Sequence, residues 1–190
     1  MDGRISYEKH NGNVKLKRVL KGLCSNLEEV AEVLQSMGAV PQSKEVHQSD
    51  YVFRLPSSLS GRDTRRIKFR IVNGEPFGVY LYDRFPEGME ASFEFIRPSD
   101  LSLVQALQSS GVPYVLVSKT RTRWLLGDML IHLDRVQDLG DVVEVEKASA
   151  NDIPCEVVDA ITPYIIKQLE GSNEDYMQPA VMGGHAQSQR

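Results

Sequence analysis

The sequence predicts an α+β protein built on an eight-stranded antiparallel β-barrel with flanking helices. Most of the chain alternates apolar and polar residues with period two, as strands with one buried face do. Turn signals such as Asn73-Gly74 and Leu126-Gly127-Asp128 separate the alternating segments. Helical spacing is confined to three segments and most connections are short, so an antiparallel sheet closed on itself is the economical arrangement.

The two periodicities also place the individual elements. We expect strands at residues 13–21, 49–55, 66–73, 77–84, 90–97, 114–124, 128–136 and 141–148. A capping box at residues 25–28 begins a helix that Gly38 ends. Two further helices are expected at about residues 99–110 and 152–169, and Pro163 should kink or split the second of them.

The composition predicts a single domain. A chain of 190 residues with 41% hydrophobic residues is long enough to bury a core of its own. We expect this domain at residues 13–170, between a flexible N-terminus at residues 1–12 and a flexible C-terminal tail at residues 171–190. The tail is rich in Gly, Gln and Ser, which is typical of mobile segments, although the stretch "EDYM" within it can pack back.

The charge and the cysteine content limit the class of protein. A formal net charge of -4 argues against a general attraction to nucleic acid or to an anionic membrane. Cys24 and Cys155 lie far apart without metal-ligand spacing, which argues against a zinc site and a disulfide framework. No apolar run suits a signal peptide or a membrane span. We therefore expect a soluble cytoplasmic protein with no nucleic-acid or membrane partner, and a homodimer stays open.

Charged residues share faces of the expected strands. Successive side chains in a strand point to opposite sides, so residues two apart lie on one face. The sets that share a charged face are Arg66, Lys68 and Arg70; Lys119, Arg121 and Arg123; Asn13, Lys15 and Lys17; His132 and Asp134; and Glu144 and Glu146. One interpretation is that these are solvated faces of a sheet whose apolar faces cover a core.

The distribution of charge favours a second interpretation. Arg and Lys gather on some strands and carboxylates on others, whereas an ordinary surface mixes the two signs. If the strands form a barrel with these faces inward, the lumen is basic with an acidic patch at one place. Arg and Lys complement phosphate oxygens, and Asp and Glu supply the oxygen ligands that Mg²⁺ or Mn²⁺ requires. The pattern therefore predicts a site for a polyphosphate and a divalent cation.

Several motifs, taken in chain order, resemble the CYTH family, the triphosphate tunnel metalloenzymes that include adenylyl cyclases of the fourth class and thiamine or inorganic triphosphatases. The motifs are "NVKLK", "HQSDYVF", "RRIKFR", "YLYDR", "KTRTRW" and "IHLDRVQDLGDVVEVE", within residues 13–148. The resemblance implies an eight-stranded antiparallel tunnel, a small-molecule triphosphate ligand and a divalent metal, Mg²⁺ or Mn²⁺. It implies that phosphate is bound by Lys17, Lys68, Arg70, Arg84, Lys119, Arg121 and Arg123, with Lys17 and Arg121 also catalytic, and that metal is held by Asp134, Glu144 and Glu146.

The first strand departs from the family pattern. The family has Glu-x-Glu-x-Lys there, and this chain has Asn13 and Lys15 in place of the two glutamates. An amide oxygen can still reach a metal, whereas the ammonium group of Lys15 repels one. Two classes of function therefore stay open. The first is a metal-dependent enzyme, either an adenylyl cyclase-like lyase or a triphosphatase-like hydrolase, and the second is a nucleotide- or polyphosphate-binding module whose catalysis Lys15 has weakened.

Other candidate residues have weaker support from the sequence. His132 is a candidate for proton transfer, because it lies two residues before Asp134 and on the same face. Tyr80 and Tyr82 could stack on a base, although alternating aromatic residues in strands are more often core residues. The basic stretch "RRIKFR" could contact nucleic acid, but its regular apolar interleaving favours a strand.

Overall fold

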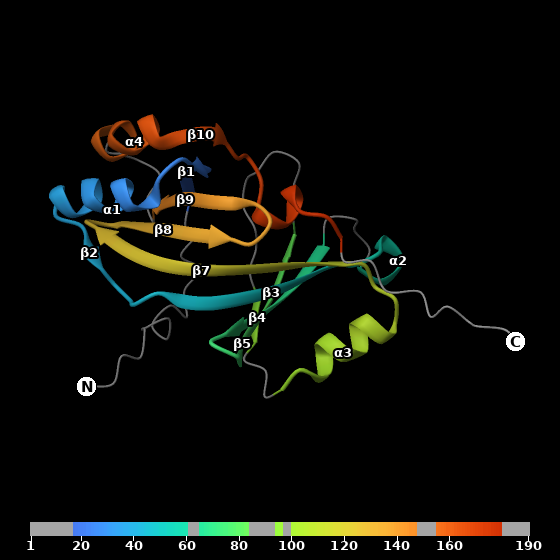
Figure 1. The fold of residues 1–190 in the computed structure, drawn as a ribbon. Helices are drawn as coiled ribbons and strands as arrows, with labels where there is room; N and C mark the ends of the chain where they lie inside the picture. The colour runs from blue at the N-terminus through green and yellow to red at the C-terminus, as the bar shows by residue number, and fades with distance from the viewer. Residues whose placement is uncertain (1–16, 61–64, 84–93, 97–99, 148–154, 180–190) are drawn as a thin grey trace, which may run out of the picture.

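The computed structural model describes residues 17–60, 65–83, 94–96, 100–147 and 155–179 (Figure 1). The strands are β1 (Lys17–Cys24), β2 (Val40–Pro41), β3 (Val46–Arg54), β4 (Arg65–Val72), β5 (Glu75–Asp83), β6 (Glu94–Ile96), β7 (Tyr114–Leu126), β8 (Met129–Val136), β9 (Gly140–Lys147) and β10 (Ile165–Gln168). The helices are α1 (Leu27–Ser36), α2 (Ser57–Ser60), α3 (Ser102–Ser109) and α4 (Cys155–Ile161), with short 3-10 helices η2 (Thr162–Tyr164) and η3 (Asn173–Tyr176). Within these ranges, no helix has the length and apolar character that crossing a bilayer requires.

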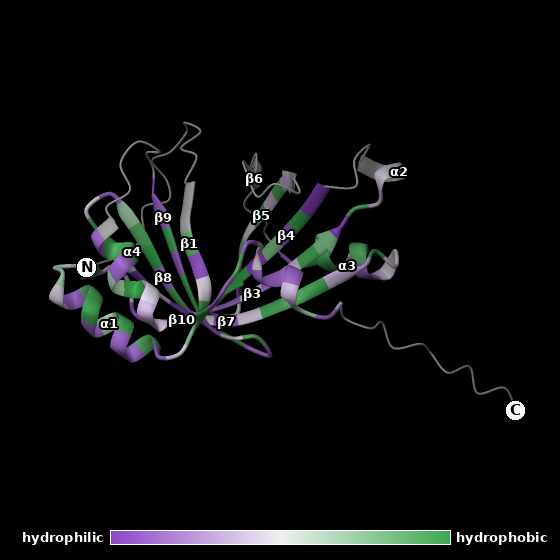
Figure 2. Cartoon of the chain, turned by 90° about the horizontal axis from the view of Figure 1, so that it is seen from above, coloured by the Kyte–Doolittle hydropathy of each residue, from purple (hydrophilic) through white to green (hydrophobic). Residues whose placement is uncertain are grey.

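All the strands belong to one antiparallel sheet. Its order is β10-β1-β9-β8-β7-β3-β4-β5-β6, and β2 pairs with β7 beside this row. The sheet is bent into a trough, in which β1, β8 and β9 form one arm and β4 and β5 form the other (Figure 2). Within the described residues no hydrogen-bonded pairing joins β10 to β6. The α+β class and the antiparallel sheet are therefore confirmed, and closure into a barrel is not.

The strand predictions agree with the structure more closely than the prediction of the third helix. The expected strands correspond to β1 and to β3–β9, and residues 13–16, 84, 90–93, 97 and 148 of these expected strands lie outside the described ranges. The short strands β2 and β10 were not predicted. The expected helix at 152–169 is wrong in its second half, because α4 ends at Ile161 and η2 begins with Pro163 in its first turn. Residues 165–168 then pair with β1 as an edge strand.

Two apolar cores cover the outer face of the trough. On one arm, α1 and α4 pack against β1, β8 and β9 through residues such as Leu34, Ile131 and Ile161. On the other arm, α3 packs near β3, β4 and β5 in a cluster that includes Phe53 and Phe69. Figure 2 shows α1 outside the first arm and α3 outside the second. The helices therefore support the sheet from outside and leave its inner face for other side chains.

Along β7, β8 and β9 the inner face has an apolar end and a charged end. The apolar end is a cluster of Val115, Val117, Val136 and Val142 with Leu169, which follows β10. Further along β7, the same face carries Lys119, because alternate residues of a strand share a face. On the other arm, the buried Asp50 lies opposite Val117, so charge there reaches the level of the apolar cluster.

Candidate functional site

The register of the strands brings charged side chains together on the inner face. Directly opposite residues of antiparallel strands share a face, with their Cβ atoms about 5 Å apart. The opposed pairs across successive strands are Asp50 with Arg70, Arg121 with Asp134, Arg123 with His132, His132 with Glu144, and Glu144 with Lys21. The inner face thus carries a row of charges that crosses both arms of the trough.

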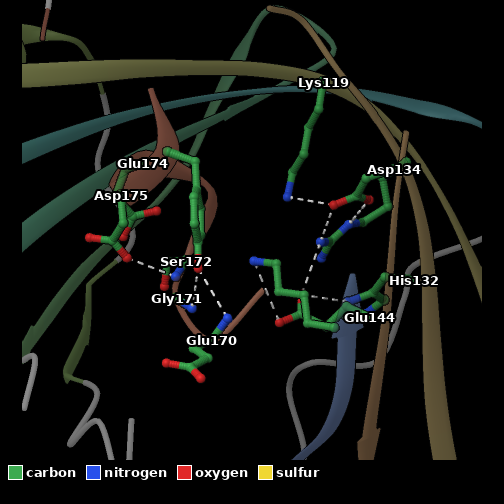
Figure 3. A network of polar contacts seen from close by, with 12 residues as sticks. Lys119, His132, Asp134, Glu144, Glu170, Gly171, Ser172, Glu174 and Asp175 are labelled. Carbon is green, nitrogen blue, oxygen red and sulfur yellow. Dashed lines mark hydrogen bonds and ion pairs between the residues drawn. The ribbon is translucent and has the colours of Figure 1, made fainter. Parts of the chain in front are cut away.

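Asp134 is the most deeply buried carboxylate of this row, at 1% exposure. Lys119 Nζ donates to its Oδ2 at 3.0 Å, and Arg121 donates from Nε and Nη2 to both oxygens at 2.6 Å (Figure 3). Burial opposes ionisation of Asp134, but the charges of Arg121 and Lys119 outweigh it and hold the pKa of this carboxyl below its usual range. Asp134 is therefore an ionised group held by two cations.

Asp50 and Arg70 form a second buried pair, on the other arm. Arg70 Nε and Nη2 donate to the two carboxylate oxygens of Asp50, both at 2.7 Å. This two-bond geometry fixes the guanidinium plane. Burial again opposes ionisation, and the charge and hydrogen bonds of Arg70 outweigh it, so the pKa of Asp50 lies below its usual range. Asp50 was not among the site residues predicted from the sequence.

Lys68 lies two residues before Arg70 and has different partners. Its Nζ lies 4.9 Å from the ring centre of Tyr80 and 5.5 Å from that of Tyr82. Among the residues that the structure describes, no carboxylate forms an ion pair with it. Burial, followed by the charge of Arg70, lowers the pKa of Lys68 to about 8. Lys68 is thus a partly buried cation whose contacts are two aromatic rings.

His132, Glu144 and Glu146 form a group that could hold a metal ion. One ligand atom from each lies within 4.8 Å of the others. Both ring nitrogens of His132 are buried and have no hydrogen-bond partner among the described residues, and Nδ1 is 3.8 Å from Glu144, beyond hydrogen-bond range. Burial, followed by the charge of Arg121, lowers the pKa of His132 to about 4, so the ring is neutral near pH 7. A neutral imidazole beside two carboxylates fits a divalent cation.

Positive side chains surround the same carboxylates. Glu144 has Arg121 at 3.7 Å and Lys21 at 4.0 Å, and Figure 3 shows it beside His132. The sequence-based set for the metal was Asp134, Glu144 and Glu146. Asp134 differs from the other two because Lys119 and Arg121 already occupy its oxygens. In this geometry His132, rather than Asp134, supplies the third ligand atom near the two glutamates.

The remaining sequence-based site residues are placed only in part. Arg123 is buried on the inner face opposite His132. Lys17 pairs with Lys147 in the backbone register, and its side chain lies outside the described part of the structure. Asn13, Lys15 and Arg84 also lie outside the described residues.

Sequence reasoning missed Lys21 and Gln48. Lys21 is buried opposite Glu144, and a bulge between Arg18 and Leu20 interrupts the alternation that leads to it. Gln48 is 1% exposed, and neither of its amide atoms has a hydrogen-bond partner among the described residues. Its position in "HQSDYVF" two residues before Asp50 was the available signal, because the two share a face.

Comparisons with known proteins agree with this fold. A family model described as the CYTH domain matches residues 17–176, and no curated protein matches the chain. The structure is similar to that of the PH1012 protein from Pyrococcus horikoshii OT3, with 16% identity and a TM-score of 0.62 over 85% of this chain and 100% of that one.

A second solved structure belongs to a Vibrio parahaemolyticus protein described as a candidate adenylate cyclase. It has 14% identity and a TM-score of 0.58, over 82% of this chain and 94% of that one. At sequence identities of 16% and 14%, these two solved structures support the fold and no more. The family model covers most of the chain, including every strand of the sheet, and on that ground the chain belongs to the CYTH family.

Proposed function

We propose that the protein is a metal-dependent triphosphatase that binds a triphosphate along the charged inner face. The observation that carries the proposal is the position of the buried cations Lys119 and Arg121 and the partly buried cations Lys68 and Arg70 on the same face as His132, Glu144 and Glu146. Phosphoryl transfer depends mainly on positioning and on neutralising the charge of the phosphate oxygens. A row of cations next to a metal-binding group supplies both.

The cations have distinct roles in this proposal. Lys68, Lys119 and Arg121 bind phosphate oxygens, and Arg121 also faces the reacting phosphate because it lies between Asp134 and Glu144. Arg70 and Arg123 line the same face, and the family resemblance adds Lys17 and Arg84. Asp50 and Asp134 orient their arginines, since each accepts two hydrogen bonds from one guanidinium group.

The metal would be held by His132, Glu144 and Glu146. When bound, a divalent cation supplies positive charge that neutralises the phosphate oxygens. Imidazole nitrogen suits Mn²⁺ better than Mg²⁺, which prefers oxygen ligands, so we expect Mn²⁺ to be the preferred ion. The group lies on β8 and β9, and thus it does not require Asn13 or Lys15.

Water is the proposed nucleophile. Its oxygen forms a new bond to the terminal phosphorus while the bridging P–O bond breaks, which gives phosphate and a diphosphate. An adenylyl cyclase would also need a surface on which the adenine base of ATP can stack. The tyrosines described on the inner face already have cations over their rings. Lys68 lies over Tyr80 and Tyr82, and Arg70 lies over Tyr80 at 5.4 Å. This arrangement favours hydrolysis over cyclisation of a nucleotide.

The proposal is tested by a product assay with tripolyphosphate, thiamine triphosphate and ATP, each with Mn²⁺, with Mg²⁺ and with a chelator. We expect release of phosphate from at least one of these compounds, only when metal is present. Formation of cyclic AMP from ATP would instead identify a cyclase. Metal-independent binding of all three compounds without any product would identify the binding module.

Lys68→Met tests the phosphate-binding face most cleanly. Removing Arg121 would break a buried ion pair and leave Asp134 with Lys119 alone, a change that costs up to about 3–5 kcal/mol in folding free energy, whereas Lys68 has no ion pair to break among the described residues. We expect Lys68→Met to weaken tripolyphosphate binding by about tenfold or more, as expected for a lost hydrogen bond to a charged group. Calorimetry checks this, with the exposed Lys44→Met as control. Equal affinity in the two variants would contradict the proposed face.

Polyphosphate affinity should fall as the pH rises through about 8. Lys68 is charged below its pKa and neutral above it. This pKa is lowered to about 8, mainly by burial and then by the charge of Arg70. The charges of Asp50 and Glu174 oppose the shift, and that of Lys119 adds to it. A bound phosphate favours the charged lysine, so binding near this pH should take up a proton. Calorimetry in two buffers of different ionisation enthalpy measures the uptake. Lys68→Met should abolish it, and a wild-type affinity that is constant across this range would count against the role of Lys68.

His132→Ala should weaken Mn²⁺ binding more than Mg²⁺ binding. The imidazole is the ligand that distinguishes the two ions, and its loss should reduce Mn²⁺ affinity by about tenfold or more, the scale of changes around metal sites. Metal titration by calorimetry, without substrate, measures both affinities. The exposed His47→Ala serves as control. If His132→Ala left the affinity for Mn²⁺ unchanged, His132 would not be a ligand.

A further inference from the structure

The chain after β10 crosses the inner face at its apolar end (Figure 1). We call residues 169–177 the clasp. At its start, Leu169 N donates to Lys21 O at 2.9 Å, which joins the clasp to β1. Leu169 is buried among inner-face valines, and Met177 packs against the same cluster. The clasp therefore begins at one arm of the trough and lies over its apolar end.

The clasp keeps its shape through its own hydrogen bonds. Ser172 and Asp175 form a capping box around η3, and Ser172 N donates to Asp175 Oδ2 at 2.8 Å. The backbone N–H groups of Glu170 and Gly171 donate to the Tyr176 hydroxyl at 3.0 and 3.1 Å (Figure 3). Because these bonds lie within the clasp, they do not depend on contact with the sheet. A movement of the clasp would therefore not have to break these bonds.

Glu174 carries the clasp to the other arm. Its side chain is buried, at 7% exposure, and its Oε1 accepts a hydrogen bond of 2.8 Å from the Tyr82 hydroxyl. Lys68 lies over the ring of the same tyrosine, and the charge of Glu174 acts on Lys68. The carboxylate therefore sits in the neighbourhood of a cation that, under the proposed function, binds phosphate.

Glu174 differs from the other carboxylates near the inner-face cations. Asp50, Asp134 and Glu144 lie on strands, whose positions the sheet hydrogen bonds fix. Glu174 lies on a short 3-10 helix outside the sheet. A ligand anion can displace a carboxylate of a strand only by rotating its side chain, whereas it can displace Glu174 also by moving the clasp.

We propose that Glu174 is an internal competitor for the phosphate group that reaches Lys68, so that the clasp sets the affinity and ligand selectivity of the inner face. This inference rests on the proposed function. A phosphate that reaches Lys68 comes close to the Glu174 carboxylate, because Lys68 and Glu174 both contact Tyr82, and the two anions repel each other. The clasp then loses its contact with Tyr82 and moves. A ligand that leaves Lys68 unoccupied does not disturb the clasp.

Glu174→Gln tests the competition while keeping an oxygen that accepts the Tyr82 hydrogen bond. We expect this variant to bind tripolyphosphate about fivefold more tightly or better, as for a coupling of ordinary size between two sites. Glu170→Gln removes the same charge from an exposed position of the clasp and should leave the affinity unchanged. Equal affinity of Glu174→Gln and wild type would overturn the inference. Equal gains in both variants would attribute the effect to net charge alone and would overturn it as well.

Hydrogen exchange provides a second, independent readout. Tripolyphosphate should speed exchange at the Leu169 amide of the wild type, since its bond to Lys21 is part of the clasp's contact with the sheet. Exchange at this amide that stays unchanged or slows on saturation would overturn the inference. Different outcomes would contradict the proposed function. In that case tripolyphosphate would bind neither the wild type nor Glu174→Gln, or it would bind both and Lys68→Met would not change its affinity. Binding that depends on Lys68 but not on Glu174 would leave the proposed function intact.

Discussion

The buried carboxylate of Asp134, held by Arg121 and Lys119, is the interaction on which the inner face depends. A charge at 1% exposure costs several kcal/mol in free energy unless partners with good geometry surround it. Both cations come from β7 and the carboxylate from β8, so the register of these two strands is tied to their pairing. The pairing of Asp50 with Arg70 imposes the same condition on β3 and β4. The guanidinium groups are thereby held in place before any ligand arrives.

The same pairing limits how strongly the inner face can attract an anion. Each paired arginine already shares its charge with a carboxylate, so a phosphate gains less from it than from an unpaired cation. Lys68 has aromatic neighbours instead, and the group of His132, Glu144 and Glu146 can add the charge of a metal. Under the proposed function, this balance would favour a metal-bound polyphosphate over a simple anion, because the metal and the phosphate bring complementary charge together.

The sequence predicted the elements whose alternation is regular and failed where tertiary contacts decide. The face shared by Lys119, Arg121 and Arg123 follows from period two alone, and all three are buried together. The pairing of Arg121 with Asp134 could not be read from either strand, since it depends on the register between them. The position of Glu174 depends on the path of the chain after β10, for which no periodic pattern exists. Whether a sheet closes into a barrel likewise depends on contacts between strands that are far apart in the chain, and no such pairing joins β10 to β6 within the described residues.

The two apolar cores on the outer face have a consequence for cooperativity. β7 is thirteen residues long, and Trp124 near one end packs against the first core while Tyr114 at the other end packs against the second. Each arm therefore has its own apolar support and can act as a separate unit in local unfolding. Lys68 belongs to one arm and His132 to the other. A ligand that contacts both residues would connect two separately stabilised arms. Part of its binding free energy would then oppose unfolding of either arm alone, so that the two arms would unfold together.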